Sequence, residues 1–153
     1  MAANRIRIAK DKVELVKALV ASKDTTGAFQ TYVEVMVFAA ALGAKHKKRV
    51  PLDGIAKDLS PLRQDYFSTS FILLINLLAM TEIKDINILS EQEVADEQRI
   101  HVFEEYANGG LEVLQNELRG SVDYSERLLL ILRSEKNKQE EQEVEFDLRK
   151  FLY

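Results

Sequence analysis

The sequence EQRIHVFEEYANGGLEVLQNEL, residues 97–118, carries a helical pattern on both sides of two adjacent glycines. Apolar residues recur at the spacing of one helix face, first at Ile100, Phe103 and Ala107 and then at Leu111, Leu114 and Leu118. Two glycines inside a helix cost about 2 kcal/mol relative to alanine. We therefore expect a corner or a close helix crossing at residues 108–110.

Upstream of this pattern, the segment FILLINLLAM, residues 71–80, is apolar on every side of a helix. We expect it to be buried all round, with Asn76 as a hydrogen-bonded core amide, because an unpaired buried amide costs about 1–3 kcal/mol. Ser60 before Pro61 predicts a helix start, since proline is tolerated at the first helical position.

An earlier helix is marked by the capping box TYVE, in which Thr31 caps the helix and Glu34 reaches back to it. We expect this helix to end at Gly43, because glycine is the common residue just past a helix. These patterns predict a mostly α-helical single-domain bundle over residues 1–134. Residues 135–153 are expected to form a polar acidic spacer and an apolar C-terminal hook.

The composition narrows the classes of protein to which the chain can belong. With 153 residues, 46% of them apolar, it is long enough for one domain with a real core. It has no cysteine, which excludes disulfides and zinc–thiolate sites and fits a reducing compartment. Its most apolar run is half the length of a bilayer span. We therefore expect a cytoplasmic protein without a membrane partner.

Charge is distributed unevenly along the chain, whose net charge is −4. Residues 1–49 carry ten Lys and Arg against four Asp and Glu, so the front is basic and the rest is acidic. The stretch FAAALGAKHKKRVPL, residues 38–52, places four cations directly after Gly43: Lys45, Lys47, Lys48 and Arg49. One or two would offset the negative end of the preceding helix. The excess predicts a contact surface for nucleic acid or for an acidic partner protein; a solvated loop is the alternative.

Residues typical of catalysis do not cluster in this sequence. His46 and His101 lie far apart in unlike surroundings, and the adjacent Glu104 and Glu105 are expected on a solvated face. No phosphate-binding loop, dinucleotide fingerprint or nucleophile elbow is present. We expect no metal, no cofactor and no enzymatic activity; a metal-dependent enzyme or a nuclease accessory remains a distant alternative.

The N-terminal segment NRIRIAK alternates between two faces, with Ile6 and Ile8 on one and Arg5 and Arg7 on the other. This pattern predicts a short strand over residues 4–8. A strand followed by two helices resembles the start of a ribbon-helix-helix module, in which two chains pair their strands and read the DNA major groove. In that arrangement the protein is a homodimer, and Arg5 and Arg7 contact bases.

Three pieces of the sequence together resemble one known family: VFAAALGAKHKKRVPL at residues 37–52, LINLLAM at residues 74–80 and IHVFEEYANGGLEVL at residues 100–114. They are similar to the bacterial DNA phosphorothioation-associated protein 4 family, also called Dnd system-associated protein 4. The resemblance covers roughly residues 5 to 118.

This resemblance implies an accessory protein of the system that replaces a backbone phosphate oxygen with sulfur, a modification–restriction system used in phage defence. The implied partners are DNA and the other proteins of that system. The candidate contact residues are Arg5, Arg7, Lys45, Lys47, Lys48 and Arg49. The alternative is a ribbon-helix-helix transcriptional regulator.

Overall fold

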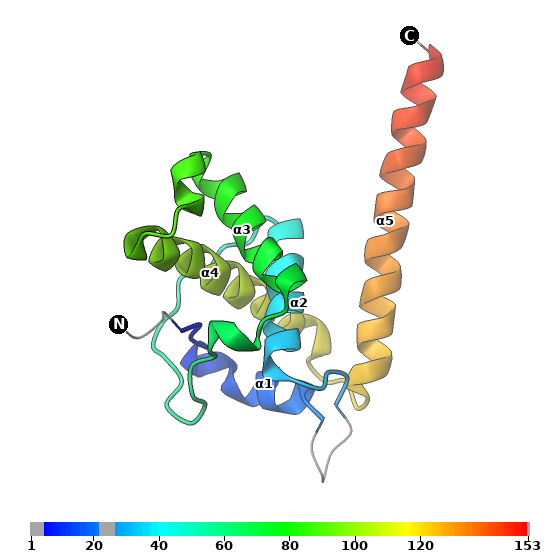
Figure 1. The fold of residues 1–153 in the computed structure, drawn as a ribbon. Helices are drawn as coiled ribbons and strands as arrows, with labels where there is room; N and C mark the ends of the chain where they lie inside the picture. The colour runs from blue at the N-terminus through cyan, green and yellow to red at the C-terminus, as the bar shows by residue number, and fades with distance from the viewer. Residues whose placement is uncertain (1–4, 22–26, 153) are drawn as a thin grey trace. The chain divides into compact units, whose positions relative to one another are not determined.

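Figure 1 traces the chain in the computed structural model, which describes residues 5–21 and 27–152, with side chains as far as residue 140. The helices are α1 (Val13–Leu19), α2 (Tyr32–Lys45), α3 (Thr69–Ile83), α4 (Glu93–Leu118) and α5 (Tyr124–Leu152). Three short 3₁₀ turns accompany them: η1 (Lys10–Lys12), η2 (Gln64–Tyr66) and η3 (Ile86–Leu89). No strand occurs among these residues, so the mostly α-helical fold class is confirmed.

The chain divides into two compact units, Met1–Glu117 and Leu118–Tyr153. The first unit contains α1 to α3 and nearly all of α4; the second is formed chiefly by α5. The predicted boundary between residues 134 and 135 falls inside α5, whose backbone continues as one helix. The side chains of the predicted C-terminal hook lie outside the described residues. Within the described part of the chain, no helix is both long enough and apolar enough to cross a bilayer.

The N-terminal segment is extended and pairs with the loop before α3. Ile6 forms an antiparallel bridge with Leu62, with backbone hydrogen bonds of 2.9 and 2.8 Å in the two directions. Ile6 and Ile8 are buried as the alternating pattern predicts. Pro61 lies beside this bridge, so the helix start predicted there is wrong. The helix begins instead at Thr69, where the Ser68 side chain accepts a hydrogen bond from the backbone N–H of Phe71.

α2 begins as the sequence predicts, with the Thr31 hydroxyl accepting a hydrogen bond from the backbone N–H of Glu34. Its predicted end at Gly43 is wrong, because the helix continues to Lys45. Gly43 lies inside α2 and is neither a turn residue nor a cap; it is a packing residue. A Cβ on it would lie 2.1 Å from the backbone oxygen of Tyr106 in α4.

The two glycines of α4 lie in an unbroken helix, so the close helix crossing is the correct alternative (Figure 1). A Cβ on Gly110 would lie 1.7 Å from the backbone oxygen of Ala39 in α2. A Cβ on Gly109 would lie 1.9 Å from the backbone oxygen of Lys48. Side chains at these positions would therefore separate α4 from α2 and from the loop that follows α2.

The expectation that residues 71–80 are buried all round is wrong. Ile75 and Ala79 are buried, but Leu73 and Leu77 are 57% and 55% exposed. Asn76 is half-buried and does not act as a core amide. Only one face of α3 packs on the rest of its unit, so uniform hydropathy along the helix does not become uniform burial.

Candidate functional site

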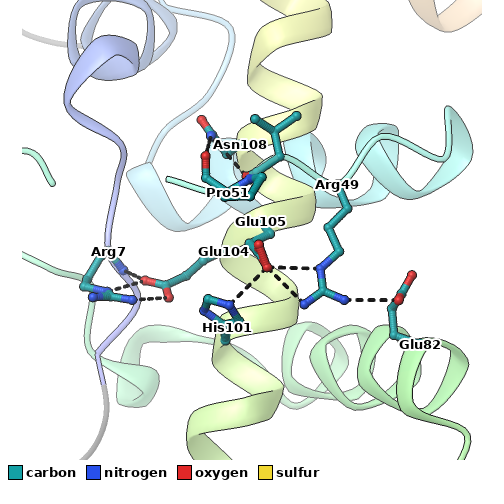
Figure 2. Close-up of polar contacts among 9 residues, drawn as sticks. Arg7, Arg49, Pro51, Glu82, His101, Glu104, Glu105 and Asn108 are labelled. Atoms are coloured by element: carbon teal, nitrogen blue, oxygen red, sulfur yellow. Dashed lines mark hydrogen bonds and ion pairs between the residues drawn. The ribbon is translucent and has the colours of Figure 1, made fainter. Parts of the chain in front are cut away.

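Two adjacent glutamates of α4 organise the polar contacts of the first unit. Glu104 and Glu105 are only 1% and 5% exposed, so the expectation that they lie on a solvated face is wrong. Consecutive residues of a helix point about 100° apart. The two carboxylates therefore face different neighbours, and each holds one arginine from a distant part of the chain (Figure 2).

Glu104 binds the N-terminal segment through Arg7. The guanidinium Nε and Nη2 donate to the two carboxylate oxygens over 2.9 and 3.1 Å, and the backbone N–H of Arg7 donates to the same carboxylate over 2.6 Å. These hydrogen bonds and the charge of Glu104 raise the pKa of Arg7. The Arg7 side chain is nevertheless 43% exposed. The segment is thus fixed to α4 while its guanidinium still reaches solvent.

Glu105 binds the loop after α2 through Arg49. Its Oε1 accepts hydrogen bonds from Nε and Nη2 of Arg49 over 3.1 and 3.0 Å and lies 3.1 Å from Nε2 of His101. The remaining guanidinium nitrogen, Nη1, donates to Glu82 of α3 over 3.1 Å. Figure 2 shows Arg49 between the two acids, so one side chain joins α3, α4 and the loop.

Glu82 also accepts a hydrogen bond from the Tyr106 hydroxyl, which links α3 to α4 a second time. This hydrogen bond, followed by the charge of Arg49, lowers the pKa of Glu82. Burial and the bond to Glu82 raise the pKa of Tyr106 to about 12. Both shifts favour the same state, with Glu82 ionised and Tyr106 protonated.

The loop that follows α2, called the basic loop for its cations at residues 47–49, lies along α4. The backbone N–H of Val50 donates to the carbonyl of Glu105 over 3.0 Å, and the Asn108 amide donates to the carbonyls of Val50 and Pro51 over 3.2 Å. Lys48 forms an ion pair of 3.2 Å with Glu112. The loop is therefore attached to α4 through main chain and side chains alike, while some of its cations stay exposed.

Three of the predicted contact residues meet at one place. Arg5, Arg7 and Arg49 all line a cleft of about 740 Å³ in the first unit, although Arg49 lies far from the other two in the sequence. His101 and the amide-bearing Gln98 line it as well. The structure therefore brings the basic N-terminus and the end of the basic loop to a common surface.

The other predicted cations do not line this cleft. Lys45 and Lys47 are exposed, and Lys47 occupies a turn with a positive φ of 53°. Lys48 faces Glu112 instead. Sequence reasoning missed Glu82, Glu104 and Tyr106, since no local pattern shows that an acid of a helix will meet a distant arginine.

In the described part of the chain, no three residues among His, Asp and Glu lie close enough together to hold a metal ion. The polar cluster around α4 consists of carboxylates already paired with guanidinium groups. This arrangement presents partly exposed arginine N–H donors, held in fixed positions, to a ligand with acceptor oxygens.

Comparison with known protein families gives a match over nearly the whole chain. The family model of DNA sulphur modification system-associated protein 4 covers residues 5–151, which extends the resemblance well beyond residue 118 into the C-terminal helix. No curated protein and no solved structure matches the chain. Because the family model covers nearly the whole sequence, the chain belongs to the family of DNA sulphur modification system-associated protein 4.

Proposed function

We propose that the protein is a non-catalytic accessory component of a bacterial DNA sulphur modification system and that it binds the DNA backbone. The observation that carries this proposal is the convergence of Arg5, Arg7 and Arg49 on one cleft. Guanidinium groups are suited to phosphate because their planar forks donate two parallel hydrogen bonds. The family's association with a DNA modification system makes DNA the natural polyanion.

The basic residues differ in how far an acidic partner within the chain offsets their positive charge. Arg7, Lys48 and Arg49 each have an acidic partner in the chain, so part of their positive charge is offset. Arg5 and Lys47 are exposed and form no ion pair with the described residues. Among the predicted contact residues, Arg5 and Lys47 are therefore two whose charge no described acid offsets through an ion pair.

A ribbon-helix-helix regulator is less well supported by the N-terminal segment. The backbone of Ile6 pairs with Leu62 on one edge of the segment, and the backbone N–H of Arg7 donates to Glu104 on the other. A strand pairing with a second chain needs an open edge of unpaired backbone groups. Both edges of this segment are occupied, so we do not adopt the alternative.

The test is a titration of labelled duplex DNA at increasing salt concentration. Replacing Arg5 and Lys47 together with Gln should make the log–log slope shallower by about 0.9 for each phosphate contact that is lost. Preference among DNA sequences should stay unchanged, because backbone contacts carry no base information. The matched control replaces Lys17 and Lys57 with Gln; both lysines are exposed, and both lie outside the cleft lining and outside the cationic stretch 45–49.

Equal salt slopes for the two double variants would show that Arg5 and Lys47 do not form the DNA-binding surface. A wild-type protein that binds no duplex at low salt, but co-purifies with other proteins of its system only when Arg5 and Lys47 are intact, would show that the surface binds a protein instead.

A further inference from the structure

The cleft is larger than a bare phosphate contact requires. Its volume of about 740 Å³ falls within the range of about 300–1,000 Å³ that is typical of small-molecule sites. We propose that it binds one nucleotide unit, with the phosphate held by Arg5, Arg7 and Arg49 and the base against the rest of the cleft. This inference rests on the proposed function and adds the site and the chemical unit that is recognised.

The two buried glutamates hold the arginines in place for a ligand. An arginine has five N–H donors. Glu104 takes two of those on the Arg7 side chain, through Nε and Nη2, and Glu104 itself is almost completely buried. Glu104 also lines the cleft, and its two carboxylate oxygens accept hydrogen bonds from the guanidinium of Arg7. The remaining donors of Arg7 are pre-oriented, which lowers the entropy cost of binding an anion.

Arg49 is positioned in the same way from the other side of α4. Glu105 accepts from its Nε and Nη2, and Glu82 accepts from its Nη1, so two of its five N–H groups remain for a ligand. Arg5 adds a guanidinium that no described residue pairs with. The lining of the cleft thus contains three arginines for an anionic ligand: Arg5, which has no ion pair with a described residue, and Arg7 and Arg49, which glutamates hold in place.

The remaining lining fits a base better than it fits a second anion. Pro61 and Ile83 supply apolar surface for the flat face of a base, while the Gln98 amide can both donate to and accept from its edge. Glu97 also lines the cleft and can accept from an amino group. The two acids of the lining, Glu97 and Glu104, leave the cleft with little net positive charge. Recognition therefore depends on directed hydrogen bonds more than on overall electrostatic attraction.

The experiment is a calorimetric titration of the full-length protein with thymidine 5′-monophosphate, thymidine and a 5′-phosphorylated DNA tetranucleotide. We expect the monophosphate to bind saturably and about tenfold more tightly than thymidine, because hydrogen bonds to a charged group supply the difference. Arg5→Gln should weaken monophosphate binding about tenfold without changing the melting temperature, since Arg5 forms no ion pair with any residue that the structure describes. Lys17→Gln should leave binding unchanged.

The arms of the experiment separate the sources of the nucleotide. Tighter binding of the tetranucleotide identifies a DNA strand end as the ligand, and equal affinity identifies a free nucleotide; both support the cleft. Equal affinity for thymidine and its monophosphate would overturn the inference, as would equal effects of Arg5→Gln and Lys17→Gln. If duplex DNA binds but none of these short probes does, the cleft inference fails while the proposed function stands.

Discussion

Replacing Gly110 with alanine should destabilise the protein, although the same change in an ordinary helix stabilises it. Alanine is favoured over glycine inside a helix by about 1 kcal/mol. At Gly110, however, the added Cβ would lie 1.7 Å from the backbone oxygen of Ala39, whereas ordinary contacts begin at 3.4 Å. α2 and α4 would have to move apart by roughly the difference, and a backbone oxygen cannot rotate away as a side chain would.

The size of the effect follows from these opposing contributions. An extra methyl group in a well-packed interior costs about 1–3 kcal/mol, and the upper end applies because the obstacle is backbone. After subtraction of the helical preference, we expect Gly110→Ala to lower the free energy of unfolding by about 2 kcal/mol. For a chain of 153 residues this corresponds to a fall in Tm of roughly 4–8 °C.

The assay is urea unfolding followed by circular dichroism, with the reverse substitution as a control. Ala41 is exposed on α2, so Ala41→Gly should cost only the helical preference of about 1 kcal/mol. Gly110→Ala and Ala41→Gly should therefore both destabilise, although they change the composition in opposite directions. A Gly110→Ala variant as stable as the wild type, or more stable, would refute the close crossing of α2 and α4.

Further substitutions test the polar network and the core. Arg7→Met should lower the free energy of unfolding by about 3–5 kcal/mol, because it leaves the buried charge of Glu104 unpaired. Glu104→Gln should lower it by only about 1–2 kcal/mol, because Arg7 still reaches solvent; equal losses in urea unfolding would contradict this. The stability that the Tyr106 hydrogen bond contributes should be fully present below the ordinary pKa of 10.0 and should be lost as pH rises through about 12. The stability that ionised Glu82 contributes should be present above pH 4.5 and lost as pH falls below it. Tyr106→Phe should therefore flatten the decline of Tm at alkaline pH. Ile75→Ala should cost about 2–5 kcal/mol, as it empties a buried position; a loss below 1 would show that α3 is not packed through this face.

Local signals predicted much of the helical structure correctly. The Thr31 cap depends on residues within one helical turn, and the buried stripe of α4 depends on a repeat that continues over many residues. The glycines of α4 were predicted to form either a corner or a crossing. Sequence alone could not decide between them, because the partner that requires a glycine at position 110 is Ala39 in another helix.

Burial and polar contacts were predicted less well because they depend on distant segments. Nothing in the neighbouring sequence distinguishes Glu104 from an ordinary surface glutamate, because its partner Arg7 lies 97 residues away. Residues 71–80 contain no polar pattern that distinguishes the packed face at Ile75 from the exposed face at Leu73. Arg5, Arg7 and Arg49 were chosen as contact residues for their charge, but their meeting in one cleft depends on the tertiary fold.

The pairing of Arg7 with Glu104 also has a consequence for folding during synthesis. The two residues are separated by 97 positions, and ribosomes add about 5–20 residues per second. Arg7 is therefore added to the chain roughly 5–20 s before Glu104 is added. During that interval Arg7 is an unpaired cation on a nascent chain, and the segment cannot reach its final position until α4 has been made. Formation of this ion pair is thus a late event in the synthesis of the first unit.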